Sequence, residues 1–153
     1  MEGMELNKGA EFLGQIKQMF ACKDQDLRAY SPLTLAYIGD AVYELVIRSV
    51  VVERANRPAN DLHKCTVKYV KAEAQSKLIQ IMLEQEMLDE EEVAIYKRGR
   101  NAKSYTIAKN ASMSDYRKAT GFEALMGYLY LAGKTDRMLE LIYKSMEAAG
   151  MEL

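Results

Sequence analysis

The sequence predicts a single all-α domain, and three observations support this prediction. Two prolines and nine glycines in 153 residues are too few for the closely spaced turns of an all-β fold. Apolar residues recur at helical spacing through most of the chain. Residues typical of helix starts precede many of these apolar runs. A chain of this length fits one domain with one hydrophobic core, so we expect no second folded module.

The N-terminal third should contain a loose tail and two helices. Residues 1–8 carry no periodic apolar pattern and are expected to form the tail. Residues 10–20 have apolar side chains at helical spacing and should form an amphipathic helix. Ser31 followed by Pro32 is typical of a helix start, because serine caps a backbone N–H and proline lacks one. This second helix should run to about Arg54.

A break at residues 57–60 separates this helix from the next. Asn60 or Asp61 should cap a helix that continues to Val70, and a further helix is expected over residues 72–87.

The C-terminal half should hold three more helices. Asp89, with Glu92 three residues later, resembles a capping box and predicts a short helix through Tyr96. Residues 99–104 lack apolar content and periodicity, so they are expected to form a basic loop. A longer helix is predicted to start at Ser112 or Ser114 and to end at Gly133. Thr135 should cap the last helix.

Composition argues against membrane and secreted proteins. The longest uncharged apolar stretch, residues 124–133, is about half of the roughly 20 residues that a bilayer requires. Glu2 and Glu5 stand where a signal peptide would be positively charged. The two cysteines show no CxxC spacing, and with a single histidine they exclude a dense zinc cluster. We therefore expect a cytoplasmic protein.

The formal net charge is −1, but the charges are segregated along the chain. Residues 97–118 contain seven bases and one acid, whereas residues 84–92 contain six acids and no base. Such runs are often solvated helix faces that attract each other. Contact of the basic run with phosphates is the less favoured interpretation, and it needs independent support.

Two acids interrupt otherwise apolar helical segments, and each has glycine nearby. Asp40 follows Gly39, while Glu123 lies between Gly121 and Gly127. Glycine within a helix costs roughly 1 kcal/mol relative to alanine unless it permits close backbone approach. Two closely crossing helices with converging carboxylates are therefore predicted. Such oxygen ligands suit Mg²⁺, which keeps several waters and needs few protein groups.

The alternative for these acids is a buried ion pair, for example with Arg48 or Arg117. Glu44 lies four residues after Asp40 on the same helix face, and a structural role is favoured for it over a catalytic one. Residues 41–52 are apolar on nearly all sides, which predicts cover by a bundle or by a second subunit.

These segments carry a family resemblance. Residues 35–45, LAYIGDAVYEL, are similar to the signature helix of the ribonuclease III family, and residues 122–131, FEALMGYLYL, resemble its second acidic helix. No segment is long enough to supply the double-stranded RNA-binding domain of the longer enzymes, so we expect that domain to be absent. The chain thus most resembles the short bacterial Mini-ribonuclease III branch, and residues 9–153 are expected to form the nuclease domain.

The resemblance implies an all-α homodimer that cleaves double-stranded RNA with Mg²⁺, for which Mn²⁺ can substitute. Asp40 and Glu123 take the positions of metal-binding and catalytic carboxylates. Ala36 and Thr120 stand where the longer enzymes have two more acids, so Thr120 and Glu44 are assigned supporting roles. The implied substrate is the precursor of large-subunit (23S) ribosomal RNA, and a ribosomal protein is a candidate accessory partner. Metal-assisted hydrolysis leaves 5′-phosphate and 3′-hydroxyl ends.

On this interpretation the basic run contacts the RNA backbone and 2′-hydroxyls of an A-form duplex. The expected RNA-binding residues are Lys97, Arg98, Arg100, Asn101, Lys103 and Ser104. Two rivals remain: a non-catalytic RNA-binding or ribosome-associated dimer on the same scaffold, and a helical protein-interaction module whose acids form buried ion pairs.

Overall fold

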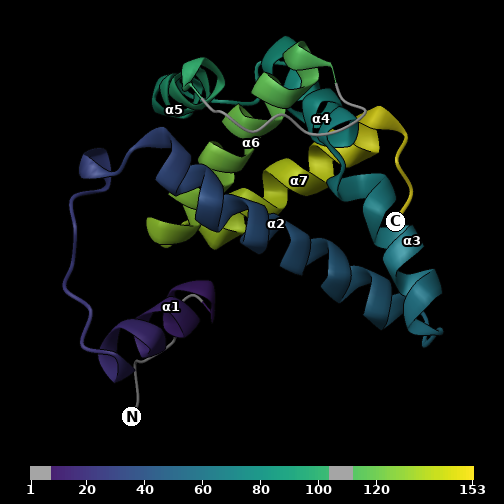
Figure 1. Ribbon diagram of the computed structural model, residues 1–153, viewed down its shortest axis with the longest axis horizontal. Coiled ribbons are helices and arrows are strands. Elements are labelled where there is room, and N and C mark those ends of the chain that lie inside the picture. Colours follow the sequence, from purple (N-terminus) through teal and green to yellow (C-terminus); the bar gives the residue numbers. More distant parts are fainter. Residues whose placement is uncertain (1–7, 104–111) are drawn as a thin grey trace.

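A computed structural model of the protein describes residues 8–103 and 112–153, and every regular element in these ranges is helical (Figure 1). The elements are α1 (Lys8–Met19), the 3-10 turn η1 (Leu27–Ala29), α2 (Pro32–Arg54), α3 (Ala59–Val70), α4 (Ala72–Glu84), α5 (Glu90–Asn101), α6 (Met113–Leu131) and α7 (Thr135–Ala149). The predicted all-α fold is confirmed. Among the described helices, none combines the length and the apolar character needed to cross a membrane.

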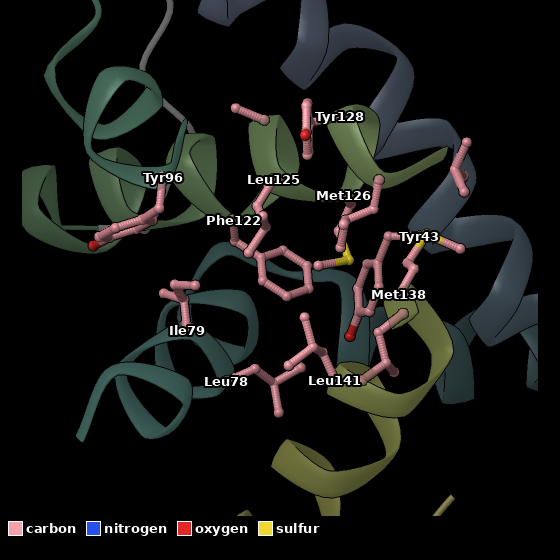
Figure 2. Close-up of a cluster of buried hydrophobic side chains, with 14 of the residues drawn as sticks. Tyr43, Leu78, Ile79, Tyr96, Phe122, Leu125, Met126, Tyr128, Met138 and Leu141 are labelled. Atoms are coloured by element: carbon pink, nitrogen blue, oxygen red, sulfur yellow. The ribbon is translucent and has the colours of Figure 1, made fainter. Parts of the chain in front are cut away.

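Helix α6 forms the centre of the core, and α2, α4, α5 and α7 pack against it. Between residues 119 and 129 every α6 residue except Glu123 is buried. Phe122 meets Tyr43 of α2 edge to face, with ring centroids 4.9 Å apart, in the middle of the apolar cluster that Figure 2 shows. Burial of one such ring stabilises the fold by roughly 1.5–3 kcal/mol. Glu123 is therefore a charged group at the edge of a closely packed apolar core.

Three predicted helix starts are confirmed by side-chain caps. Ser31 and Ser112 each accept a hydrogen bond from the backbone N–H three residues later, at 3.1 and 3.0 Å. Pro32 occupies the first turn of α2, as expected. Asp89 and Glu92 form a complete capping box at the start of α5, with reciprocal hydrogen bonds of 2.8 and 2.9 Å.

Two other predicted caps are wrong. Asn60 and Asp61 lie inside α3, which begins directly after Pro58 without a side-chain cap. Pro58 occupies the capping position, and its side chain has no atom that could accept a hydrogen bond from the first N–H groups of the helix. Thr135 is the first residue of α7 rather than its cap. Lys134 occupies the capping position. Thr135, one residue later, is buried in the fold.

The predicted basic loop is partly wrong as well, because residues 99–101 form the last turn of α5. Gly99 suggested a loop but serves close packing instead. A Cβ atom at Gly99 would lie 2.8 Å from Cβ of Ala124 and 2.9 Å from Cα of Gly121 on α6. Ser104, also expected in this loop, and residues 1–7 of the expected tail lie outside the described residues.

A buried ion pair joins α5 to α7. Glu92 is only 3% exposed, and its carboxylate accepts two hydrogen bonds from Arg137, at 2.9 Å from Nε and 2.8 Å from Nη2. Arg137 also donates to the backbone carbonyl of Met87 and to Glu140. Burial opposes ionisation of Glu92, but hydrogen bonds from Arg137 and the N–H of Asp89 outweigh it and lower its pKa. This acid is fully satisfied within the fold.

Candidate active site

Helices α2 and α6 cross backbone to backbone at two glycines. A Cβ atom on Gly39 would overlap the carbonyl oxygen of Glu123, and one on Gly127 would overlap the carbonyl oxygen of Leu35. A larger residue at either position would force the helices apart. The predicted close crossing is confirmed, and it places residue 40 of α2 beside residue 123 of α6.

Gly121 serves a different contact from the one predicted for it. A Cβ atom there would lie 2.6 Å from the ring of Tyr96 and 2.7 Å from the Tyr96 carbonyl oxygen. Gly121 therefore lets α5 approach α6, together with Gly99. Of the two glycines that flank Glu123, Gly127 sets the crossing with α2 and Gly121 sets the packing of α5.

The carboxyl groups of Asp40 and Glu123 meet at this crossing. Asp40 is exposed and Glu123 is half-buried, and their side chains share a hydrogen bond. Desolvation raises the pKa of Glu123 to about 8, and the Asp40 charge and this hydrogen bond act in the same direction. A contact from the Gln75 amide opposes the rise. The pair therefore resists carrying two negative charges without a neutralising partner, and it is open to solvent on the Asp40 side.

The ion-pair alternative holds for Glu44 but not for these two acids. Arg48 lies one turn after Glu44, with its Nη2 atom 2.6 Å from the Glu44 carboxylate. In residues 8–103 and 112–153, no lysine or arginine forms an ion pair with Asp40 or Glu123. Neither Arg48 nor Arg117 neutralises the pair, so its charge is left for another cation.

The donor set of this pair fits a hydrated divalent ion. Ala36, one turn before Asp40, is buried and carries no ligand atom. Thr120, one turn before Glu123, donates its hydroxyl to the Tyr116 carbonyl oxygen at 3.0 Å. The described residues contain no group of three or more His, Cys, Asp or Glu side chains that could hold a metal. Two carboxylates plus water suit Mg²⁺, whereas a structural zinc site needs four ligands.

Most of the predicted RNA-binding side chains lie at the C-terminal end of α5 and just beyond it. Lys97, Arg98, Asn101 and Lys103 are exposed, and Arg100 is half-buried. Arg100 stacks over the Tyr96 ring, with 5.6 Å from its Cζ atom to the ring centroid, and its Nε donates to Asn101 at 3.2 Å. The stacking holds the Arg100 guanidinium close to the α5–α6 contact, while Arg98 donates to the Tyr30 carbonyl oxygen at 3.5 Å.

Sequence reasoning missed three residues near these groups. Arg117 and Lys118 line a depression of about 400 Å³ between α5 and α6, together with Arg100, Asn101, Met113 and Ser114. Their place in the basic run was the available signal, but only the fold brings them beside Arg100. Gln75 of α4 is buried and contacts Glu123; nothing in its local sequence indicated this.

Comparisons with known proteins identify the family of this chain. The ribonuclease III domain family matches residues 33–134. A "Mini-ribonuclease 3" from Enterococcus faecalis is 50% identical over 126 residues, which cover 82% of this chain and 96% of that protein. One from Clostridium tetani is 52% identical over 119 residues, covering 77% and 78%. A crystal structure of a Fusobacterium nucleatum protein superposes with a TM-score of 0.71 at 31% identity, covering 82% of this chain and 99% of that one. The chain therefore belongs to the ribonuclease III family.

Proposed function

We propose that this ribonuclease III-type endoribonuclease cleaves double-stranded RNA with Mg²⁺ held by Asp40 and Glu123. The observation that carries the proposal is the meeting of these two carboxyl groups, which come from helices far apart in sequence. Among the described residues, no lysine or arginine forms an ion pair with either of them. Two carboxylates in contact repel each other unless a cation or proton neutralises them. A divalent ion with its water shell would neutralise the pair, and Mn²⁺ could replace Mg²⁺.

The two acids have distinct tasks in this scheme. Glu123, on the central core helix, provides a fixed ligand, because its backbone is held by Gly39 at the crossing. Asp40, exposed on α2, faces the side from which RNA and water approach. When bound, the ion activates water and stabilises charge on the departing 3′ oxygen. The products would carry 5′-phosphate and 3′-hydroxyl ends.

The basic side chains at the α5–α6 contact would hold the duplex. An A-form helix is recognised mainly through phosphates and 2′-hydroxyls across its shallow minor groove. Lys118 lies five residues before Glu123 on α6, which is about 7.5 Å along the helix axis at 1.5 Å per residue. We expect RNA affinity to fall steeply with salt concentration.

We propose large-subunit ribosomal RNA precursor as the substrate and a homodimer as the active form. The substrate rests on the similarity to the short nucleases. The dimer is supported by α2, which leaves Leu33, Tyr37, Leu45 and Val52 exposed, with Tyr37 82% accessible. Several exposed apolar side chains on one helix are typical of a subunit interface. Light scattering should give twice the mass of 17.4 kDa, and depletion of the enzyme should leave unprocessed 23S precursor ends.

The decisive experiment compares Asp40→Asn with Glu44→Gln on structured RNA. Asp40→Asn should abolish Mg²⁺-dependent cleavage while RNA binding, measured in chelator, stays nearly intact. Glu44→Gln is the matched control, because Glu44 lies on the same helix face but pairs with Arg48, and it should cleave like the wild type. Turnover by Asp40→Asn, or binding without cleavage by the wild type, would overturn the proposal.

A further inference from the structure

Gln75 is a polar side chain placed inside the bundle. It lies on α4, which packs against α6, and it is only 2% exposed. Its Nε2 atom donates a 2.8 Å hydrogen bond to the carbonyl oxygen of Val70, the last residue of α3. That bond satisfies one of the carbonyls that a helix end leaves without a partner, and it anchors the amide to the backbone.

The same amide reaches the acid pair. It lies close enough to the Glu123 carboxyl group to oppose the rise in the pKa of that group, and its helix α4 packs against α6. The other amide atom, Oε1, is buried and has no hydrogen-bond partner among the described residues. Leaving a buried carbonyl unpaired is unfavourable, and such groups are rare in folded proteins. A methionine of similar shape would fill the same space without this cost.

We infer that Gln75 is a positioning residue that holds the Glu123 carboxylate toward Asp40 for divalent cation binding. The inference rests on the proposed function of the pair. Anchored on Val70, the Gln75 amide can donate its second hydrogen to the carboxylate, which restricts the rotamers of Glu123. Groups that orient metal ligands in this way typically contribute 10- to 100-fold to metal affinity.

The test measures Mn²⁺ binding to the full chain without RNA, by the EPR signal of the free ion. Gln75→Met should weaken Mn²⁺ binding by roughly 10- to 100-fold while the far-UV circular dichroism stays that of the wild type. Thr66→Val is the matched control, because Thr66 is also buried and its hydroxyl bonds only the Leu62 carbonyl within α3. It should bind Mn²⁺ like the wild type. Wild-type affinity in folded Gln75→Met would overturn the inference.

Two further arms separate this inference from the proposed function. If the wild type and Asp40→Asn bind Mn²⁺ equally poorly, the metal site itself fails and the inference with it. If Asp40→Asn loses Mn²⁺ binding but Gln75→Met does not, only the role of Gln75 fails. Should Gln75→Met not fold, Gln75→Asn replaces it, because the shorter amide keeps polarity but cannot span from Val70 to Glu123. Unchanged affinity in that variant also overturns the inference.

Discussion

Glu92 and Glu123 are both glutamates that the fold withdraws from solvent, yet their surroundings are opposite. The Glu92 carboxylate accepts hydrogen bonds from the Arg137 guanidinium and from the backbone N–H of Asp89, the cap of its own helix, and its pKa is lowered. Glu123 faces another carboxyl group, and burial together with that neighbour raises its pKa to about 8. Glu92 has its positively charged partner, Arg137, within the chain, whereas Glu123 forms no ion pair with a described lysine or arginine.

The difference separates an acid that supports the fold from one that is available for chemistry. Groups held in an unfavourable charge state by their surroundings concentrate at functional sites. Glu92 joins α5 to α7, and its carboxylate accepts hydrogen bonds from Arg137 and Asp89. The comparison therefore yields predictions in which the two acids, and the residues around them, respond differently.

The largest expected difference is in catalysis. Glu123→Gln should lower the cleavage rate by on the order of 10³-fold, because the site loses a charge that stabilises the bound ion. Glu92→Gln should leave cleavage unchanged at temperatures where the variant is folded. The measurement is single-turnover cleavage of a defined RNA duplex in Mg²⁺. Comparable losses in both variants would abolish the distinction.

The second difference is in stability. Arg137→Met should lower the free energy of unfolding by about 3–5 kcal/mol, because it leaves the Glu92 carboxylate buried without its partner. Arg48→Met is the control: its pair with Glu44 is largely exposed, so the loss should be about 0–1 kcal/mol. Urea unfolding curves measure both. Equal effects would mean that Glu92 gains little from Arg137.

A third prediction tests whether the helix crossing brings the two carboxyl groups together. Gly39→Ala places a methyl group on the Glu123 carbonyl oxygen, and overpacking of this kind should destabilise the fold by about 3 kcal/mol. It should also weaken Mn²⁺ binding, because the two carboxyl groups separate. Gly14→Ala on α1, where a Cβ atom would meet nothing within 4 Å, should leave Mn²⁺ binding unchanged and should not destabilise the fold, because alanine is favoured over glycine within a helix by roughly 1 kcal/mol. Wild-type Mn²⁺ affinity in Gly39→Ala would show that the crossing does not place the acids.

The smallest effect is a difference in pH dependence. The folded state raises the pKa of Glu123 from 4.5 to about 8, so between these values the native chain binds more protons than the unfolded one. In chelator, stability should therefore fall as pH rises from 5 to 8, by about 2 kcal/mol after solvent screening is considered. Glu92, with a lowered pKa, contributes stability above pH 4.5 that is lost only as pH falls further. Unfolding of Glu123→Gln should lack the decline between pH 5 and 8, and an equal decline would contradict the assignment.

Sequence reasoning found the helices and the acid pair for identifiable reasons. Capping signals such as Ser31 and Ser112 act within one turn, so they can be recognised locally. Asp40 and Glu123 were found because a carboxylate and a glycine in an apolar helix both need an explanation. One structural feature explains both: the glycines allow two helices to cross closely, and this crossing brings the two carboxyl groups together.

The features that escaped prediction depend on contacts between distant segments. Glycine is typical of loops, but Gly99 lies in a helix and packs against Gly121. Thr135 satisfies a capping rule, yet the bundle buries it. The Gln75 contact joins residues 48 positions apart, and no local pattern distinguishes Gln75 from an ordinary polar helix residue. These outcomes depend on tertiary packing, which overrides local preference.

The backbone contact between α2 and α6 has a consequence for how the proposed metal ion would bind. Because main-chain atoms limit the approach at Gly39 and Gly127, the carboxyl groups are already assembled before any ion arrives. The enzyme would then be preorganised, with no closure of one helix upon the other as part of the cycle. Amide hydrogen exchange in these two helices, which reports local opening, should stay almost the same whether or not the ion is present.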